Sequence, residues 1–281
     1  MKRKAIALLS VFALCLGMFC GSGLTAFADG NPERQYCWSC GSKIPENCVY
    51  CIYCGVKLDS DAGTDENDAD GSSYNSDTEP HTEDKYKVGS YVKFGTYEQD
   101  NIRTNGPEEI EWLVLDNDGE KALLISRYAL DCQRYNTKKM YMTWENCTLR
   151  TWLNERFYNA AFTKDQQSTI ETASVTADKN TKFSTSPGSE TKDKIFLLSI
   201  AEVNKYFQTD DERKCVPTEY AVANGAFANA ETGKCMWWLR TPGCGPEYAA
   251  YVYDSGALSV SGYPVQNTYH AVRPAMWVSL T

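Results

Sequence analysis

Four cysteines near the N-terminus have the spacing of metal ligands. Cys37 and Cys40 form one C-x-x-C pair, Cys51 and Cys54 form a second, and a glycine follows each pair. Paired knuckles of this kind place four thiolates around one tetrahedral Zn²⁺. A shell of four cysteines leaves no open position for a substrate, so we predict structural zinc. Disulfides are the alternative, because thiols outside the cell tend to oxidise and Cys48 is an additional cysteine.

A second group of residues could bind a ligand without reacting with it. Tyrosines and side-chain amides gather between positions 248 and 269, and aromatic faces combined with amides suit sugar rings and their hydroxyls. The predicted ligand-binding residues are Tyr248, Tyr251, Tyr253, Tyr263, Gln266, Asn267 and Tyr269. Tyrosine is also a common strand residue, so we expect half or more of these rings in the core.

A hydrolase would use either a nucleophile activated by histidine or two convergent carboxylates. His270 is the one histidine after position 85, and we interpret it as a hydrogen-bonding structural residue. The candidate acids are Glu111, Glu145, Glu202, Glu219 and Asp254. Alternatively, Glu111 and Glu145 form structural ion pairs with Arg150, Arg240 or Arg273.

The cysteines of the C-terminal region are interpreted as disulfides or buried small hydrophobic residues. They are Cys132, Cys147, Cys215, Cys235 and Cys244, and their spacing leaves the pairing open.

The charge of the chain excludes one class of partner. It carries 28 basic and 37 acidic residues, for a formal net charge of -9. Binding to a phosphate backbone needs a basic surface, so we do not expect a nucleic-acid partner. The 42% hydrophobic content is enough for a globular core.

Residues 1–28 have the pattern of a secretory signal peptide. Lys2, Arg3 and Lys4 precede an apolar stretch, and Ala26-Phe27-Ala28 forms a cleavage site. We therefore expect a secreted or extracytoplasmic protein, associated with the cell surface and without a membrane span after cleavage. An uncleaved membrane anchor is the alternative.

Residues 59–85 read as an acidic disordered linker. From Asp59 to Asp84 the stretch has ten acidic residues, no lysine or arginine and almost nothing apolar. The run from Glu66 to Gly71 matches a calcium loop only in part, so we do not expect calcium there.

The remaining residues, 86–281, alternate strand and helix signals. Strands are predicted at 91–97, 110–115, 122–126, 195–199, 237–240, 249–253, 257–260 and 271–280. Short helices are predicted at 149–157, after Thr163, after Ser199 and at 218–224. Strands at both ends with helices inserted between them indicate an α+β domain with an antiparallel sheet.

Several ordered motifs in this domain carry a resemblance. They include Gly95-Thr96-Tyr97, Leu149-Arg150-x-Trp152-Leu153-Asn154, Trp237-Trp238-Leu239-Arg240 and Val272-Arg273-Pro274-Ala275. Together they are similar to the bacterial family called domain of unknown function 6273, over nearly all of residues 86–281. That family looks like a relative of the C-type-lectin and formylglycine-generating-enzyme fold. The resemblance implies a loop-rich face that carries ligands.

Some properties of those relatives do not carry over. The calcium-binding triplet of sugar-binding lectins is missing from the domain, and so is the late cysteine pair of the formylglycine-generating enzymes. Residues 37–58 resemble a short zinc-ribbon module found ahead of bacterial surface domains. The sequence therefore predicts a secreted or cell-surface binding module, non-catalytic, that recognises a glycan or a surface protein. The alternatives are a polysaccharide or cell-wall hydrolase and a structural module of an envelope assembly.

Overall fold

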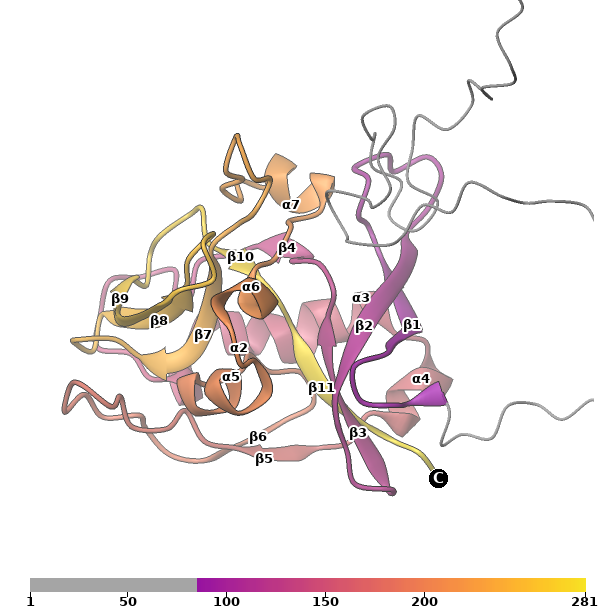
Figure 1. The fold of residues 1–281 in the computed structure, drawn as a ribbon, viewed down its shortest axis with the longest axis horizontal. Coiled ribbons are helices and arrows are strands. Elements are labelled where there is room, and N and C mark those ends of the chain that lie inside the picture. The colour runs from indigo at the N-terminus through magenta and orange to yellow at the C-terminus, as the bar shows by residue number, and fades with distance from the viewer. Residues whose placement is uncertain (1–84) are drawn as a thin grey trace, which may run out of the picture. The chain divides into compact units, whose positions relative to one another are not determined.

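A computed structural model of the chain describes residues 85–281 (Figure 1). The predicted signal peptide (1–28), the zinc-ribbon-like segment (37–58) and residues 59–84 of the predicted linker lie outside the described residues. The four predicted zinc ligands, Cys37, Cys40, Cys51 and Cys54, lie there too.

The first sheet is antiparallel and has four strands in the order β1-β2-β3-β11. Ile110, Trp112 and Val114 alternate along β2 and are at most 1% exposed, as expected when one face of a sheet meets the core. Gly119, at φ +91°, lies in the tight turn from β2 to β3, where we expected a hairpin. The strands are β1 (Tyr91–Tyr97), β2 (Glu108–Asn117), β3 (Lys121–Ser126) and β11 (Ala275–Ser279).

The second sheet has five strands in the order β4-β10-β7-β8-β9. Its pairs are antiparallel except β10 with β7, which run parallel. The strands are β4 (Asp131–Cys132), β7 (Trp237–Pro242), β8 (Tyr248–Val252), β9 (Leu258–Pro264) and β10 (Ala271–Val272). A short ribbon of β5 (Ala173–Val175) and β6 (Thr191–Asp193) completes the strands.

The closing strand predicted at 271–280 is two strands. β10 ends at Val272 in the five-stranded sheet, and β11 begins at Ala275 in the four-stranded sheet. Pro274 lies between them and has no N–H to donate, while its carbonyl accepts from the Ser126 N–H at 2.9 Å. The last strand segment therefore joins the two sheets.

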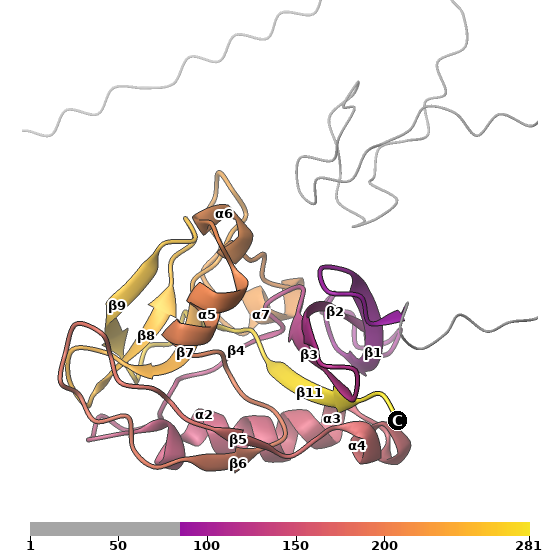
Figure 2. The same cartoon turned by 60° about the horizontal axis from the view of Figure 1, so that its bottom comes forward.

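The longest helical stretch lies along one side of both sheets, as Figure 2 shows. It is continuous from α2 (Thr148–Trp152) through a π-helical turn, η2 (Leu153–Phe157), to α3 (Tyr158–Ala161). The apolar spacing predicted this helix, and Leu149, Leu153 and Phe157 are at most 1% exposed.

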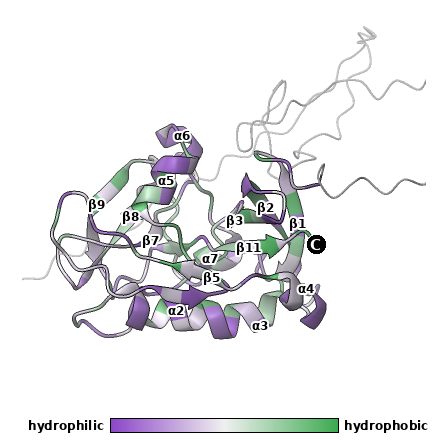
Figure 3. Ribbon diagram, turned by 90° about the horizontal axis from the view of Figure 1, so that it is seen from below, coloured by the Kyte–Doolittle hydropathy of each residue, from purple (hydrophilic) through white to green (hydrophobic). Residues whose placement is uncertain are grey.

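The other helices are single turns or slightly longer. Two have the capping boxes expected from sequence, formed by Thr163 with Gln166 and by Ser199 with Glu202. They are η1 (Trp144–Asn146), α4 (Lys164–Thr169), α5 (Ile200–Tyr206), α6 (Asp210–Arg213) and α7 (Glu219–Ala223). Figure 3 shows α4 and α6 as mostly hydrophilic and β11 as mostly hydrophobic.

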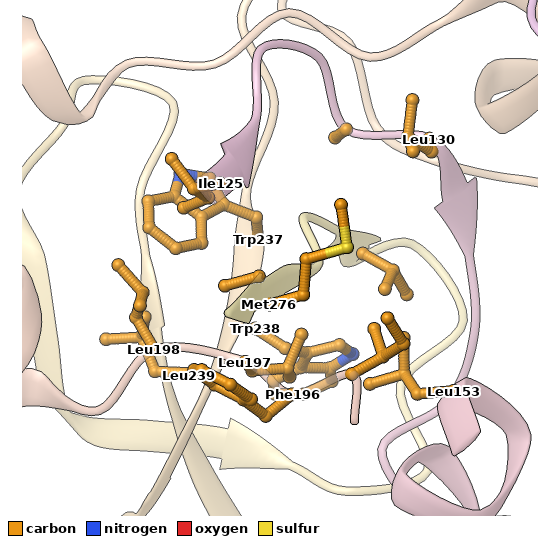
Figure 4. Close-up of a cluster of buried hydrophobic side chains, with 14 of the residues drawn as sticks. Ile125, Leu130, Leu153, Phe196, Leu197, Leu198, Trp237, Trp238, Leu239 and Met276 are labelled. Carbon is orange, nitrogen blue, oxygen red and sulfur yellow. The ribbon is translucent and has the colours of Figure 1, made fainter. Parts of the chain in front are cut away.

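The core lies where the sheets and the long helix meet (Figure 4). Side chains from six segments pack there: Ile125, Leu130, Leu153, Phe196, Leu197, Leu198, Trp237, Trp238, Leu239 and Met276. The predicted strand at 195–199 is buried as expected, but it pairs only through a single bridge from Phe196 to Ala275. Its Leu197 and Leu198 carbonyls accept hydrogen bonds from Arg240 instead.

The described domain thus combines mixed sheets, mostly antiparallel, with short helices, consistent with the α+β expectation. Within residues 85–281, no helix has the length and apolar character that a membrane span requires.

Candidate functional site

The predicted ligand-binding tyrosines pack largely against one another. Tyr251 is 3% exposed, and its ring centroid lies 4.7 Å from that of Tyr253 and 6.1 Å from that of Tyr263. Tyr263 in turn lies 5.6 Å from Tyr269. Tyr251 therefore belongs to the core. Tyr253 and Tyr263 are 39% and 37% exposed, and Tyr248, Gln266, Asn267 and Tyr269 are half-buried.

His270 is the centre of this aromatic cluster. The imidazole is fully buried and stacks on Trp238 at 4.1 Å and on Tyr269 at 5.2 Å, with the Tyr251 ring edge-on at 4.4 Å. Burial lowers the pKa of His270 to about 3. The ring is neutral at physiological pH, because an imidazolium there would lose its hydration.

Asn267 fixes how this imidazole is protonated. Its Oδ1 accepts from the backbone N–H groups of Tyr269 and His270 at 2.9 and 3.1 Å, and lies 2.7 Å from His270 Nδ1. An oxygen acceptor at that distance requires the proton on Nδ1. Nε2 is then a lone-pair atom, and it has no hydrogen-bond partner among residues 85–281. The Asn267 amide therefore holds His270 in place within the cluster, and we interpret His270 as a structural residue.

A groove of about 570 Å³ is lined in part by Thr268, from the segment at 267–270. Residues from β4 and the loop after it line the groove, and residues of the long helix form its helical wall. Asn224, after α7, and Thr268 close it. The lining residues are Cys132, Gln133, Arg134, Thr137, Thr148, Leu149, Thr151, Trp152, Glu155, Arg156, Asn224 and Thr268.

A buried carboxylate orients two of these lining side chains. Asp131 is 2% exposed and accepts hydrogen bonds from Tyr97 Oη at 2.6 Å, Gln133 Nε2 at 3.1 Å and Asn224 Nδ2 at 3.3 Å, and from the Cys132 backbone N–H at 2.6 Å. Burial raises its pKa even though these four donors oppose the shift. No positively charged side chain contacts Asp131 within the described part of the chain.

The orientation of the two amides has a chemical consequence. Because their NH₂ groups face the Asp131 carboxylate, a flip of either amide would place oxygen against oxygen. The amide oxygens of Gln133 and Asn224 are therefore held as acceptors, and neither has a partner among residues 85–281. Such fixed acceptors suit a ligand that offers hydroxyl groups.

The thiol in the groove is not activated. Cys132 Sγ lies 3.1 Å from the Thr268 carbonyl oxygen and 3.4 Å from that of His270. Burial, followed by the nearby charge of Asp131, raises the pKa of Cys132 to about 12. A thiol with so high a pKa is protonated at neutral pH and is a poor nucleophile.

The acids considered for catalysis lie outside the groove. Glu111 pairs with Arg127 at 2.7 Å and Glu202 with Arg240, while Asp254 accepts from Asn229 at 2.6 Å. Glu145 accepts from the Ser189 N–H, and Glu219 begins α7. Glu111 thus pairs with Arg127 and not with one of the three arginines expected from the sequence. Glu145 forms no ion pair within residues 85–281. Arg150 instead pairs with Asp193 at 2.6 Å.

One acidic group could hold a cation. The carboxylates of Glu98, Asp100 and Glu108 lie within 4.8 Å of one another and are half-buried. Two of them are already engaged: Glu108 accepts from the Gln99 N–H at 2.6 Å, and Asp100 accepts from Asn105 at 2.7 Å. Exposed acidic groups of this kind are common in proteins, and this one is unrelated to the predicted zinc ligands.

Sequence reasoning missed the groove because its residues come from four separated segments. The sequence position of Asp131 could have indicated a buried carboxylate, because this acid lies between the apolar residues Leu130 and Cys132 at the start of a short strand. A lone acid in such a context is usually paired or hydrogen-bonded when buried.

Comparison with known proteins supports the family expectation. Residues 119–280 match the family model described as Domain of unknown function (DUF6273). No curated protein matches the chain, and no solved structure matches it. The matched segment includes every residue that lines the groove and the aromatic cluster around His270. The chain therefore belongs to the DUF6273 family.

Proposed function

We propose that the domain is a non-catalytic binding module and that its groove recognises a glycan. The observation that carries this proposal is the pair of groove amides, Gln133 and Asn224, held by the buried carboxylate of Asp131. Their oxygens are set as acceptors before a ligand arrives, which reduces the entropic cost of forming hydrogen bonds to sugar hydroxyls.

The rest of the lining fits the same class of ligand. Trp152 offers a half-buried indole on the helical wall, and an aromatic face can stack on the apolar side of a sugar ring. Thr137, Thr148 and Thr151 add hydroxyl groups that both donate and accept. Arg134 and Arg156 lie at the groove as well, which favours a glycan that carries a carboxylate or another anionic group.

Binding without chemistry is favoured by the state of the nearest reactive groups. The Cys132 thiol is protonated, since its pKa is about 12, and the neutral His270 ring lies inside the aromatic cluster. The hydrolase remains the alternative, with Glu155 in the lining and Asp131 beneath it as the available carboxylates. Asp131 is held by four donors, which limits its use as a base.

The test is a screen of the full chain against immobilised bacterial and host oligosaccharides, with and without calcium, while the sugars are monitored for cleavage. We expect retention of intact, acidic glycans without a calcium requirement. Trp152→Ala should weaken retention about fivefold, because a stacked ring contributes on the order of 1 kcal/mol. Tyr253→Ala is the matched control, since Tyr253 is exposed in the aromatic cluster and does not line the groove.

The variants also distinguish the two candidate faces. If Tyr253→Ala or Tyr263→Ala abolishes retention while Trp152→Ala does not, the aromatic cluster and not the groove is the binding site. Release of shortened sugars would instead establish a hydrolase.

A surface protein is the second candidate ligand. Met140 and Tyr141, in the loop that follows Thr137, are 51% and 77% exposed, and exposed apolar side chains beside a groove favour a protein contact. This candidate would be favoured if the chain retained no glycan in the screen but bound a purified envelope fraction, and if Tyr141→Ser abolished that binding. The same result would also be compatible with a structural module of an envelope assembly.

The location and the fold relation belong to the same proposal. We infer a C-type-lectin-like arrangement, supported by the antiparallel hairpins, the long loops and the shared sheet of the first and last strands, β1 and β11. The basic and apolar pattern of residues 1–28 supports secretion.

The zinc prediction has its own measurement. The purified chain beginning at Asp29 should contain one zinc per molecule if Cys37, Cys40, Cys51 and Cys54 bind it. A metal-free preparation with these four cysteines in disulfides would contradict the zinc ribbon and leave the groove proposal intact.

A further inference from the structure

Two cysteines that are distant in sequence lie side by side in the core. The Cys235 N–H donates to the Cys215 carbonyl at 2.9 Å, and the two thiols are close enough that each shifts the pKa of the other. Their residues are 0% and 2% exposed. A backbone hydrogen bond of this kind holds Cα atoms roughly 5–6 Å apart. That separation lies inside the range of about 4.4–6.8 Å that a disulfide spans.

A buried cation that has no carboxylate partner within residues 85–281 lies next to this pair. Arg273 is 4% exposed, and its guanidinium lies over the rings of Trp237 at 5.1 Å and Phe207 at 5.6 Å. Its Nε donates to the Ser126 carbonyl at 2.9 Å, while Nη1 has no hydrogen-bond partner within residues 85–281.

The charge of Arg273 favours the thiolate form of both cysteines. Burial by itself would raise the pKa of Cys215, but the hydrogen bond from Cys235 and the charges of Arg273 and Lys234 lower it to about 7. The pKa of Cys235 is raised, by burial first and by its neighbour second. Cys215 is therefore the thiol that ionises first, and a thiolate is the form that attacks a disulfide.

We propose that Cys215 and Cys235 form a disulfide bond when the chain folds in an oxidising compartment. The occurrence of the bond in the cell rests on the proposed secretion of the chain. The ability of the two cysteines to form the bond does not rest on secretion, because the fold brings them together.

The reaction is thiol–disulfide exchange with a disulfide-bonded oxidant, such as an oxidoreductase or oxidised glutathione. The Cys215 thiolate attacks one sulfur of the oxidant and displaces the other as a thiolate. The Cys235 thiolate then attacks Cys215 Sγ in the mixed disulfide and displaces the second oxidant sulfur. The two cysteines lose two electrons and two protons, and the oxidant becomes two thiols. Because both thiols are buried in the folded domain, exchange takes place late in folding, once Cys215 and Cys235 have their native neighbours but before the core closes over them.

The bond would tether the segment that brings Asn224 to the groove. It closes the loop from 216 to 234, which carries α7 and the groove residue Asn224. Thr218, at the start of α7, is anchored to the Ala129 carbonyl by its N–H at 3.0 Å. A disulfide across the base of this loop restricts how far Asn224 can move from Asp131.

The experiment compares two refolding conditions for the full chain. The purified chain is unfolded and reduced, then refolded either with a mixture of reduced and oxidised glutathione or with excess dithiothreitol. Free thiols are then blocked under denaturing conditions, and the digested peptides are identified by mass. We expect a linked peptide that joins Cys215 to Cys235 after oxidative refolding only. The thermal unfolding midpoint should rise by several degrees in the oxidised sample.

Three variants define the outcome. Cys215→Ser and Cys235→Ser should each lose the linked peptide and the shift in unfolding midpoint. Cys132→Ser is the matched control, because Cys132 is the other thiol that affects the pKa of Cys235, and the variant should retain both the linked peptide and the shift. Blocked thiols at both Cys215 and Cys235 after oxidative refolding, or a bond from either one to Cys132, would overturn the proposal. None of these outcomes depends on glycan binding.

Discussion

The aromatic cluster and the groove contain similar kinds of side chain but use them in opposite ways. Around His270 the rings and the Asn267 amide satisfy one another, so that a tyrosine such as Tyr251 is 3% exposed. In the groove, a buried acid directs the amides of Gln133 and Asn224 so that their oxygens stay available. A dense run of aromatic residues in the sequence therefore marked packing, whereas the open site was assembled from remote segments.

The largest expected difference concerns acid stability and His270. Its folded pKa of about 3 lies below the unfolded value of about 6.5, so the unfolded chain binds a proton in that window and the folded chain does not. The contribution of the neutral His270 to the free energy of unfolding should therefore be fully present above pH 6.5. It should fall by about 1.4 kcal/mol per pH unit as the pH drops toward 3.

Denaturant unfolding between pH 7.5 and about 4.5 measures this slope before most carboxylates titrate. His270→Phe should flatten the profile, while His81→Gln, at the only other histidine of the chain, should not. Equal slopes for the wild-type chain and His270→Phe would mean that the imidazole is accessible to protons in the folded domain.

Removing a ring from the cluster should cost more than removing one at its edge. Tyr251→Ala deletes a buried ring that contacts Trp238 and His270, and we expect a loss of about 3 kcal/mol. Tyr253→Ala deletes a ring that is 39% exposed, and the loss should stay below about 1 kcal/mol. Chemical denaturation of both variants tests this, and comparable losses would show that Tyr253 is part of the core.

The two asparagines separate stability from binding. Asn267→Ala leaves three donors without their acceptor and should lower the free energy of unfolding by about 2 kcal/mol, with groove affinity kept in the folded fraction. Asn224→Ala removes one part-buried contact, the weakest of four to Asp131, and should leave stability within about 1 kcal/mol while affinity falls severalfold. Paired unfolding and glycan-retention assays test both variants. If Asn224→Ala leaves glycan retention unchanged, the oriented amide is not used.

Asp131 should show the smaller pH effect, with the opposite sign from His270. Burial raises the pKa of Asp131 above its unfolded value of about 3.9. The contribution of Asp131 to the free energy of unfolding is therefore fully present below about pH 3.9 and is lost as the pH rises through the folded pKa. Asp131→Asn should remove this loss, so that the variant gains on the wild-type chain as the pH rises from 4 toward 7. A variant that instead loses ground over this range would show that the carboxylate is stabilised when ionised.

Local patterns predicted most of the fold. Period-two burial and the Asp118-Gly119 turn located the first hairpin, and Ser199 with Glu202 located the start of α5. The segment predicted as a strand at 195–199 is buried as expected but forms only a single bridge, and the side chain of Arg240 takes the Leu197 carbonyl that a neighbouring strand would have used. Propensity describes the segment itself and not the partner that competes for its backbone.

The site was less predictable, and for a physical reason. Tyr251 and Asn267 were assigned to ligand binding from their chemistry, but burial and hydrogen-bond partners decide whether that chemistry is available, and both depend on tertiary contacts. Asp131 and Trp152 come together with Asn224 only through the fold, and no spacing along the chain records it.

The change of sheet at Pro274 bears on the order in which the domain can be assembled. β10 supplies the parallel neighbour of β7, and β11 supplies the partner of β3, which precedes it by about 150 residues. Neither sheet is complete until these last residues have left the ribosome, and such distant pairings are slow to form. A chain stalled or cleaved before position 271 would expose two open sheet edges at once, which makes it a ready target for quality-control proteases.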